Sequence, residues 1–320
     1  MTTRILGQGL EVSSIGLGIM GMDHAYGKPA NREDMMKLIR QSVNWGGNFF
    51  DTAPVYGAEN EILLGRALKP IRNQAVIATK FGIVGQSHGQ SGVNNILDSK
   101  PDSIRHQVES SLKNLQVDTI DLYYQHRVDP EVSPEAVAQV MSDLIKEGKI
   151  KYWGVSNAPL DYIERAHKVT PITAMENQYS MVFRSPEKEI FDFCEQHGIG
   201  FVAYSPLGNG FLSGKLPDLK EKDSSDFRTS MGRFKPEVMK RNQVVLDYLA
   251  QLAADKNVTA AQIVLAWELA QRPYIVPIPG TTKLHRLQEN LGAMDISLTG
   301  DEVAAINEKL DAMRLDETHF

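Results

Sequence analysis

Three apolar runs in the middle of the chain decide its fold: Ala75-Val-Ile-Ala-Thr-Lys80, Thr119-Ile-Asp-Leu-Tyr-Tyr124 and Lys151-Tyr-Trp-Gly-Val155. Helical segments separate them, and prolines suited to a first helical turn open these segments at Pro101 and Pro134. The runs are mostly apolar on both faces, which is typical of parallel strands that helices cover on both sides. The alternation therefore predicts a parallel sheet.

The same alternation extends outward in both directions. The other strand-like runs are Ser14–Gly18, Asn48–Asp51, Ile172–Glu176, Ile199–Tyr204 and Tyr274–Ile278. The other predicted helices run from Asn31 to Trp45, over Asn60–Leu68, from Leu160, from Ser185 to Gly198, over Pro236–Asp255 and Ala260–Gln271, and from Lys283. Eight strand–helix units predict an α/β fold, a closed (β/α)8 barrel of the TIM-barrel type with additional C-terminal helices.

The segments outside these units complete the predicted architecture. Thr3–Val12 holds two short runs about Gly7-Gln-Gly9, which we interpret as a β-hairpin plugging the bottom of the barrel. The connections 82–100 and 207–235 are too long for plain turns, and long loops in a compact domain are usually functional or disordered. Because no Pro/Gly-rich linker divides the chain, we expect residues 1–320 to form one domain.

Composition excludes several classes of protein. The formal charge is −6, so the chain lacks the basic surface that nucleic acids or anionic membranes require. The single cysteine, Cys194, excludes an intramolecular disulfide and a multi-cysteine zinc site, and the histidines do not cluster like metal ligands. Without a signal-peptide pattern or a run long enough to span a membrane, the sequence predicts a cytoplasmic protein.

One glycine motif points to a different fold. Gly16-x-Gly18-x-x-Gly21 matches the dinucleotide-binding pattern of doubly wound folds. That pattern works only when the glycines lead directly into a helix, whose N-terminus holds the pyrophosphate. Here the segment from Met22 to Pro29 intervenes. We therefore keep the doubly wound fold as the structural alternative and treat the match as accidental.

Polar residues mark the carboxyl ends of most predicted strands. They are Asp51, Lys80, His126, Ser156 with Asn157, Gln178 and Ser205. Barrel enzymes carry their active sites on this face, where residues from distant parts of the chain converge. Each residue alone has an ordinary structural explanation, such as a helix cap or a surface ion pair. Their recurrence predicts a functional site.

Four of the polar residues suggest a proton donor facing a carbonyl group. Tyrosine, with an ordinary pKa of about 10, is a poor acid at neutral pH, and a nearby ammonium group lowers its pKa. Lys80 is placed to do this for Tyr56, while Asp51 holds Lys80 charged and in position. His126 is expected to bind the carbonyl oxygen or to help relay the proton.

These residues lie within motifs that resemble the aldo-keto reductases over nearly the whole chain. The motifs are Asp51-Thr-Ala-Pro-Val-Tyr-Gly57, Ala78-Thr-Lys80, Tyr124-Gln-His126, Gly154-Val-Ser-Asn157, Asn177-Gln178, Tyr204-Ser-Pro-Leu-Gly208 and Ile278-Pro-Gly-Thr-Thr-Lys283. The resemblance implies an oxidoreductase that reduces aldehydes or ketones with NADPH and uses no metal. It assigns Tyr56 as the general acid, Asp51 and Lys80 as the residues that tune it, and His126 as its carbonyl-orienting partner.

The resemblance also assigns residues to the cofactor. Ser156, Asn157 and Gln178 match the positions that bind the nicotinamide carboxamide, and Tyr204 matches the aromatic residue that stacks on the ring. The loop that crosses the pyrophosphate corresponds to Ser205, Pro206, Leu207, Gly208, Gly210, Lys215 and, more weakly, Arg228. Gly280, Thr282, Lys283 and Arg286 match the 2′-phosphate region, and Glu289 and Asn290 match the adenine contacts.

The substrate pocket is expected around the residues that follow the first, third and fourth strands. Ile19 and Met20 are assigned to the cofactor site. They are also expected to line the adjoining substrate pocket, together with Phe81, Arg127 and the connection 82–100. Trp153 lies in mid-strand and is expected to pack in the core. Because Met20 stands where related reductases often have a bulky aromatic residue, the sequence does not favour a steroid or sugar substrate.

Two other functions compete with carbonyl reduction. One is a nicotinamide-binding regulatory protein like the β subunits of voltage-gated potassium channels, although the sequence has no additional N-terminal segment for that role. The other is a barrel isomerase or lyase that uses Asp51 and Lys80 alone, which leaves Tyr204 and the Lys283–Arg286 cluster without a purpose. The expected partner is a small carbonyl compound, and the sequence leaves the oligomeric state open.

Overall fold

An eight-stranded parallel sheet forms the centre of the molecule. In the computed structural model of the chain, residues 2–89, 92–216 and 226–318 are described. In sheet order the strands are β12 (Ile275–Pro277), β11 (Gly200–Tyr204), β10 (Ala174–Gln178), β9 (Ile150–Ser156), β8 (Ile120–Gln125), β5 (Val76–Phe81), β4 (Phe49–Asp51) and β3 (Leu17–Gly18). The edges meet where the Gly16 N–H donates to the Pro277 carbonyl oxygen at 2.9 Å. The predicted (β/α)8 barrel is therefore confirmed.

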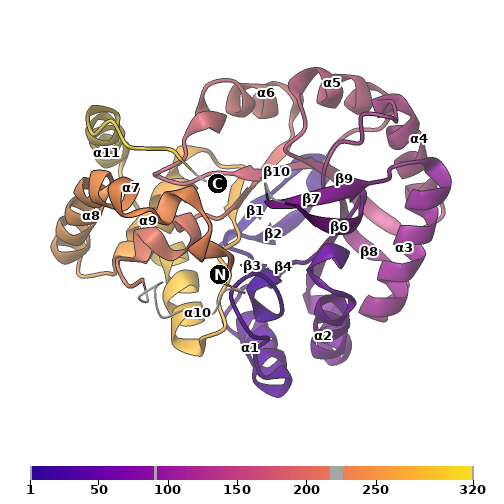
Figure 1. Cartoon of the computed structure of the whole chain (residues 1–320), viewed down its shortest axis with the longest axis horizontal. Coiled ribbons are helices and arrows are strands. Elements are labelled where there is room, and N and C mark those ends of the chain that lie inside the picture. Colours follow the sequence, from indigo (N-terminus) through magenta and orange to yellow (C-terminus); the bar gives the residue numbers. More distant parts are fainter. Residues whose placement is uncertain (1, 90–91, 217–225, 319–320) are drawn as a thin grey trace.

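Helices surround the strands (Figure 1). They are α1 (Arg32–Asn44), α2 (Ala58–Leu68), α3 (Pro101–Leu115), α4 (Pro134–Lys146), α5 (Leu160–Val169), α6 (Ile190–His197), α7 (Pro236–Arg241), α8 (Gln243–Lys256), α9 (Ala260–Gln271), α10 (Leu284–Leu291) and α11 (Gly300–Ala312). Helix α1 begins where expected, because the Asn31 side chain accepts a hydrogen bond from the Asp34 backbone N–H. Ser133 caps α4 in the same way.

Two predicted helices are interrupted. The segment Pro236–Asp255 breaks at Asn242, whose buried side-chain amide bonds the backbone of Asp316 through both its oxygen and its nitrogen. That contact with the C-terminal segment separates α7 from α8. The helix expected from Ser185 begins as a short 3-10 turn over Ser185–Glu187, and α6 starts only at Ile190.

The N-terminal hairpin closes the bottom of the barrel, as predicted. Strands β1 (Thr3–Ile5) and β2 (Glu11–Ser13) pair antiparallel. Leu6, Leu10 and Val12 are buried against side chains from inside the barrel. At Gly7 the backbone approaches so closely that a Cβ would lie 2.5 Å from the Thr173 carbonyl oxygen. Only glycine fits this contact.

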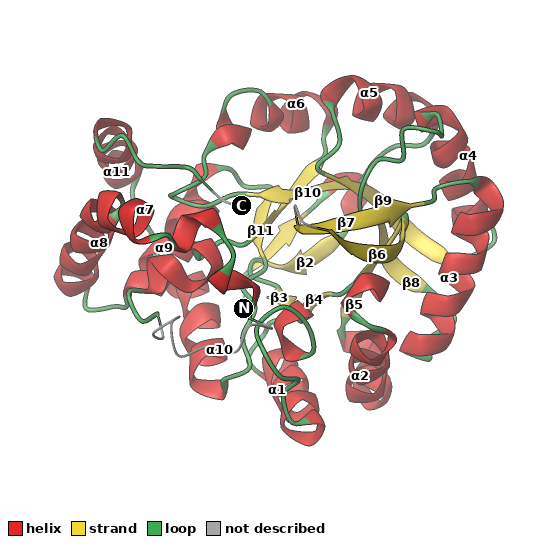
Figure 2. Ribbon diagram, in the orientation of Figure 1, coloured by secondary structure: helices red, strands yellow, loops and turns green. Residues whose placement is uncertain are grey.

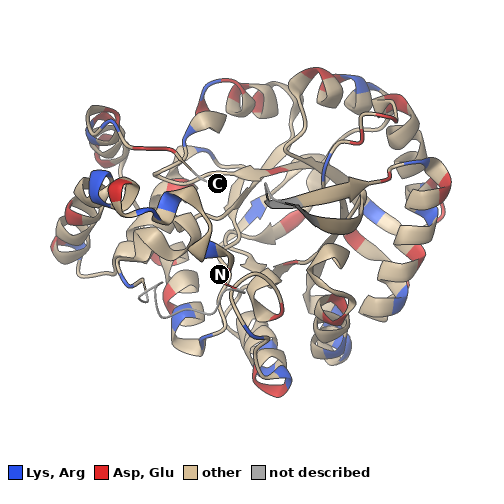
Figure 3. Cartoon of the chain, viewed as in Figure 1, with Lys and Arg blue, Asp and Glu red and all other residues tan. Residues whose placement is uncertain are grey.

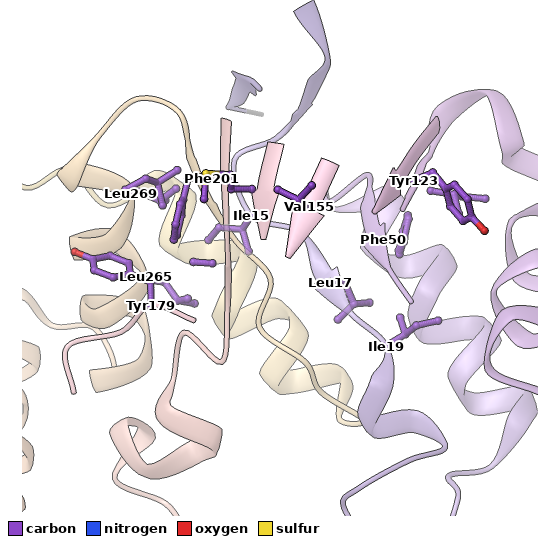
Figure 4. Packing of buried hydrophobic residues seen from close by; sticks show 14 of the residues in the cluster. Ile15, Leu17, Ile19, Phe50, Tyr123, Val155, Tyr179, Phe201, Leu265 and Leu269 are labelled. Carbon is purple, nitrogen blue, oxygen red and sulfur yellow. The ribbon is translucent and has the colours of Figure 1, made fainter. Parts of the chain in front are cut away.

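A larger hydrophobic core lies between the strands and the outer helices. Figure 4 shows Phe50, Val155 and Phe201 from the strands together with Leu265 and Leu269 from α9. Trp153 is fully buried and donates its indole N–H to the Thr170 carbonyl oxygen, which confirms its expected core position. This packing holds the strands rigidly and fixes the positions of their carboxyl ends.

The connection 82–100 differs from the expected loop. It forms the antiparallel strands β6 (Ile83–Gly89) and β7 (Gly92–Leu97), which Figure 2 shows as a ribbon in front of the barrel strands. The backbone pairing is accompanied by a hydrogen bond from Gln86 Nε2 to Asn95 Oδ1. Residues 90–91 of this connection, and residues 217–225 of the connection 207–235, lie outside the described part of the chain.

No helix in the described ranges is long and apolar enough to cross a lipid bilayer.

Candidate active site

The predicted catalytic residues converge at the carboxyl ends of neighbouring strands. Asp51 is the last residue of β4, Lys80 lies near the end of β5, and His126 directly follows β8. Tyr56 ends a 3-10 turn over Pro54–Tyr56, which follows β4. The lysine ammonium lies 5.6 Å from the centre of the Tyr56 ring, and the rings of Tyr56 and His126 are 6.0 Å apart. The structure therefore brings all four residues together.

A buried ion pair anchors the site. Lys80 is 1% exposed, and its ammonium lies 2.5 Å from Asp51 Oδ1 and donates to the Thr52 carbonyl oxygen at 3.0 Å. Burial by itself lowers the pKa of Lys80, but the neighbouring carboxylates raise it above its ordinary value. Lys80 is therefore charged at neutral pH, as the sequence predicts.

Tyr56 departs from the expected electrostatics. Burial raises its pKa above the ordinary value, and Lys80 lowers it by less than burial raises it. The prediction that Lys80 brings the pKa down is thus wrong for the net shift in the bare protein, although the direction of the lysine's own effect is right. The physical reason is the cost of placing a phenolate among apolar and acidic groups.

His126 is held in its neutral form. Burial lowers its pKa well below the ordinary value, and the positive charges of Lys80 and Arg127 lower it further. Within the described ranges, its imidazole nitrogens make no hydrogen bond to another residue. A neutral imidazole beside Tyr56 can donate to or accept from an oxygen atom, depending on its tautomer.

Residues assigned to the nicotinamide lie on the neighbouring strands. Ser156 Oγ accepts hydrogen bonds from Arg127 and from the Asn157 amide, at 3.2 and 3.0 Å. Gln178 is buried, and its Nε2 has no hydrogen-bond partner among the described residues. Tyr204 is half-buried at the end of β11. An unpaired buried amide donor is costly, which fits a site that a polar ligand group completes.

The loop after β11 has unusual backbone geometry. Ser205, Gly208, Asn209 and Gly210 all have φ between +50° and +100°. Alternating right- and left-handed residues turn backbone N–H groups toward one side and form concavities suited to anions. Within the assigned loop Pro206 and Gly208 are buried, Leu207 is half-buried and Lys215 is exposed.

The residues assigned to the adenosine end lie just before α10 and within it. Lys283 and Arg286 are exposed, and neither forms an ion pair with any described residue. Gly280 passes so close to β3 that a Cβ would lie 2.9 Å from the Gly18 carbonyl oxygen. Thr282 and Glu289 are half-buried, and Asn290 is buried.

Comparison with known proteins identifies the family. The family model described as "Aldo/keto reductase family" matches residues 14–311. The chain is 41% identical over 303 residues to "Probable aldo-keto reductase 1" of Glycine max, covering 94% of this chain and 86% of that protein. The chain belongs to the aldo/keto reductase family.

Solved structures of aldo/keto reductases share the fold. The glycerol dehydrogenase AKR11B4 from Gluconobacter oxydans is 28% identical, with a TM-score of 0.86 and coverage of 98% of this chain and 96% of that one. An aldo/keto reductase from Klebsiella pneumoniae, in complex with NADP and acetate, is 24% identical with a TM-score of 0.75. It covers 99% of each chain.

Two of the expected pocket residues are buried in the core of this aldo/keto reductase. The side chains of Ile19 and Phe81 are buried in the hydrophobic core, so neither lines an open pocket (Figure 4 labels Ile19). Arg127 donates to the His126 carbonyl oxygen and to Ser156. Met20 remains half-buried at the start of a short 3-10 turn. For Ile19, the end of the first barrel strand is held against α2, because Asn60 Nδ2 donates to the Ile19 carbonyl oxygen.

Two arginines in the connection 207–235 differ from the expectation for the pyrophosphate loop. Arg228 forms a two-pronged contact with the Asp226 carboxylate and stacks on Tyr26, so its charge is already compensated. Arg233, which the sequence analysis missed, is 2% exposed and donates to Asn209 Oδ1 at 3.1 Å. Its Nη2 has no hydrogen-bond partner among the described residues. The only feature of the sequence that points to Arg233 is its position in the connection 207–235, part of which is assigned to the cofactor.

Glu176 and His24 are also missed. Glu176 lies on β10, 3% exposed, with Oε2 3.3 Å from the Lys80 ammonium. Its place within an apolar run hides it in the sequence. The His24 ring stacks on Tyr56 with 5.9 Å between ring centres, and the His126 ring meets the same tyrosine edge-on at 6.0 Å. Tyr56 therefore contacts two imidazole rings.

Proposed function

We propose that the protein reduces aldehydes or ketones to alcohols with NADPH. The observation that supports this best is the buried Asp51–Lys80 pair beside Tyr56 and a neutral His126, all at one end of the barrel. A hydroxyl donor, a fixed positive charge and a neutral imidazole are the groups that stabilise negative charge on a carbonyl oxygen as it is reduced.

The four side chains divide the work of proton transfer. NADPH, when bound, supplies the hydride that the carbonyl carbon accepts. Tyr56 gives its phenolic proton to the carbonyl oxygen, which completes the alcohol and leaves a phenolate. Lys80 stabilises that phenolate through its charge, and Asp51 keeps the lysine in place. His126 orients the carbonyl oxygen by hydrogen bonding, and solvent returns the proton to Tyr56.

The residues present fit a phosphorylated dinucleotide. The unpaired Nε2 of Gln178 suits the carboxamide oxygen, together with Ser156 and Asn157. The left-handed backbone of the loop at 205–210 and the unpaired Nη2 of Arg233 suit the pyrophosphate. Lys283 and Arg286 beside the start of α10 suit a 2′-phosphate, where charge and helix dipole act together. The same fold holds NADP in the Klebsiella structure.

We further propose that the chain acts as one domain in the cytoplasm on small carbonyl compounds. The half-buried His24 ring, with its centre 5.9 Å from that of Tyr56, borders the place where a carbonyl group would meet the tyrosine.

NADPH oxidation tests the function directly. We expect turnover with at least one of an aromatic aldehyde, methylglyoxal, a diketone and pyridoxal. Tyr56→Phe removes the proton donor, so kcat/KM falls by about 100-fold or more while the Kd for NADPH, measured by fluorescence, stays the same. Tyr248→Phe, a half-buried tyrosine on α8, is the matched control and keeps full activity. Equal rates for wild type and Tyr56→Phe would show that the proposed acid is wrong.

A further inference from the structure

Glu176 occupies the inside of the barrel at the level of the catalytic lysine. It lies on β10, in register with Ser156 of β9 and Val202 of β11. Its Oε2 is 3.3 Å from the Lys80 ammonium, which is 2.5 Å from Asp51 Oδ1. Glu176, Asp51 and Lys80 are each less than 5% exposed. Two carboxyl groups therefore share one ammonium group in a buried space.

This group carries an excess negative charge if all three members are ionised. A net charge removed from water is expensive, and protonation of one carboxyl removes that cost. The carboxyls of Asp51 and Glu176 are also within hydrogen-bonding reach of each other. Asp51 Oδ2 has no hydrogen-bond donor among the described residues, and Glu176 Oε2 has only the ion-pair contact with Lys80, without a hydrogen bond. Two ionised carboxylates repel each other, whereas one added proton lets one carboxyl group donate a hydrogen bond to the other.

We propose that Glu176 is a positioning residue for Lys80 and holds this added proton at neutral pH, so that the lysine stays paired with Asp51 beside Tyr56. The inference rests on the proposed function, because Lys80 acts there through Tyr56. Glu176 rather than Asp51 holds the proton because its contact with the ammonium is longer, and attraction weakens with distance.

The surroundings of Glu176 favour the neutral acid. Burial and the charge of Asp51 raise the pKa of Glu176 to about 8, against the opposing effect of Lys80. The groups that face it from the packed elements are Asp51 of β4, Lys80 of β5, Tyr56, Tyr124 of β8 and Tyr204 of β11. Lys80 is the only cation among these named groups, and it already belongs to the shared pair.

Loss of the proton changes the catalytic tyrosine. Ionised Glu176 adds a negative charge that raises the pKa of Tyr56. Tyr56 then becomes a weaker acid, and Lys80 is drawn between two carboxylates. Carbonyl reduction should therefore slow as pH rises through the titration of Glu176.

Infrared difference spectroscopy tests the proton itself. Between about pH 6.5 and about pH 9.5, the wild type should lose a carbonyl stretching band of a protonated carboxyl, and Glu176→Gln should lack this change. The matched control is Glu61→Gln, a fully buried glutamate of α2 bonded by Thr79 and Asn114. It should retain the band. Absence of the band from the wild type, or its persistence in Glu176→Gln, overturns the proposal.

The pH profile of kcat/KM tests the link to catalysis. We expect the wild-type value to fall about fivefold or more from about pH 7 to about pH 9.5, and Glu176→Gln to stay level over that range. Parallel profiles overturn the positioning role. If the wild type oxidises no NADPH with any carbonyl compound, the proposed function is wrong. The infrared band still shows whether Glu176 is protonated. Because that band is measured in the wild type, a poorly folding variant does not prevent the test.

Discussion

Individual residues in this site owe their chemistry to neighbours far away in the sequence. Lys80 remains charged although it is buried, because Asp51 and Glu176 raise its pKa. His126 remains neutral because burial and two nearby cations lower its pKa. Residue type alone predicts neither outcome, since desolvation and charge pairing act in opposite directions and depend on distance.

At the same scale, we expect Lys283 and Arg286 to carry a preference for NADPH over NADH. Each charge-assisted hydrogen bond contributes about 1.5–3 kcal/mol, so the pair should favour NADPH by roughly tenfold or more. Replacing both by methionine should abolish the preference, measured as the ratio of kcat/KM for the two cofactors. Lys69→Met, at an exposed lysine in the turn after α2, is the control. A ratio that survives the double substitution would refute the assignment.

Elements position the site by how they begin, end and pack. Helix α9 is apolar on nearly every face and is buried from Ile263 to Leu269. It packs against β12 and against the helical turn Gly208–Ser213 in the cofactor loop. The break at Asn242 separates α8 from α7, and the ribbon formed by β6 and β7 replaces the expected loop. The local sequence predicts the helices, but it does not predict the tertiary contact that interrupts a helix at Asn242 or the pairing of β6 with β7.

The start of α9 offers a test at this scale. Thr259 accepts a hydrogen bond from the Gln262 N–H, and the Gln262 side chain bonds back to the Thr259 N–H. Thr259→Ala removes this cap and should lower the free energy of unfolding by about 1 kcal/mol in urea titrations. Thr259→Ser keeps the hydroxyl acceptor and should stay within a few tenths of wild type. Equal losses in both variants would mean that the methyl group, not the cap, matters.

At the scale of the whole molecule, the distribution of charge explains how an acidic chain could bind an anionic cofactor. Figure 3 shows acidic and basic residues mixed over the outer helices. The net charge of −6 speaks against a long polyanion, but a dinucleotide needs only a few local cations. Lys283, Arg286 and Arg233 lie in the segments that the proposed site uses. The distribution of charge therefore matters more than its total.

The burial of His126 leads us to expect a particular pH dependence of the free energy of unfolding. Because the pKa of His126 is lowered in the folded state, the unfolded chain binds its proton more readily. The free energy of unfolding should thus fall as pH decreases below about 6.5, the ordinary histidine pKa. His126→Gln should show a shallower fall in urea titrations from about pH 7.5 to about pH 5. Curves of equal slope would show that His126 does not contribute to the acid sensitivity.

The sequence by itself determined the barrel, its N-terminal hairpin, the family and the strand ends at which the catalytic residues meet. These follow from local periodicity and from motifs in fixed order. Tertiary structure alone decided that Glu176 shares Lys80, that Asp226 compensates Arg228, that Ile19 and Phe81 are buried, and that burial dominates the pKa of Tyr56. The reason is physical: closing the barrel sets the distances between residues on different strands, and those distances fix desolvation and charge pairing.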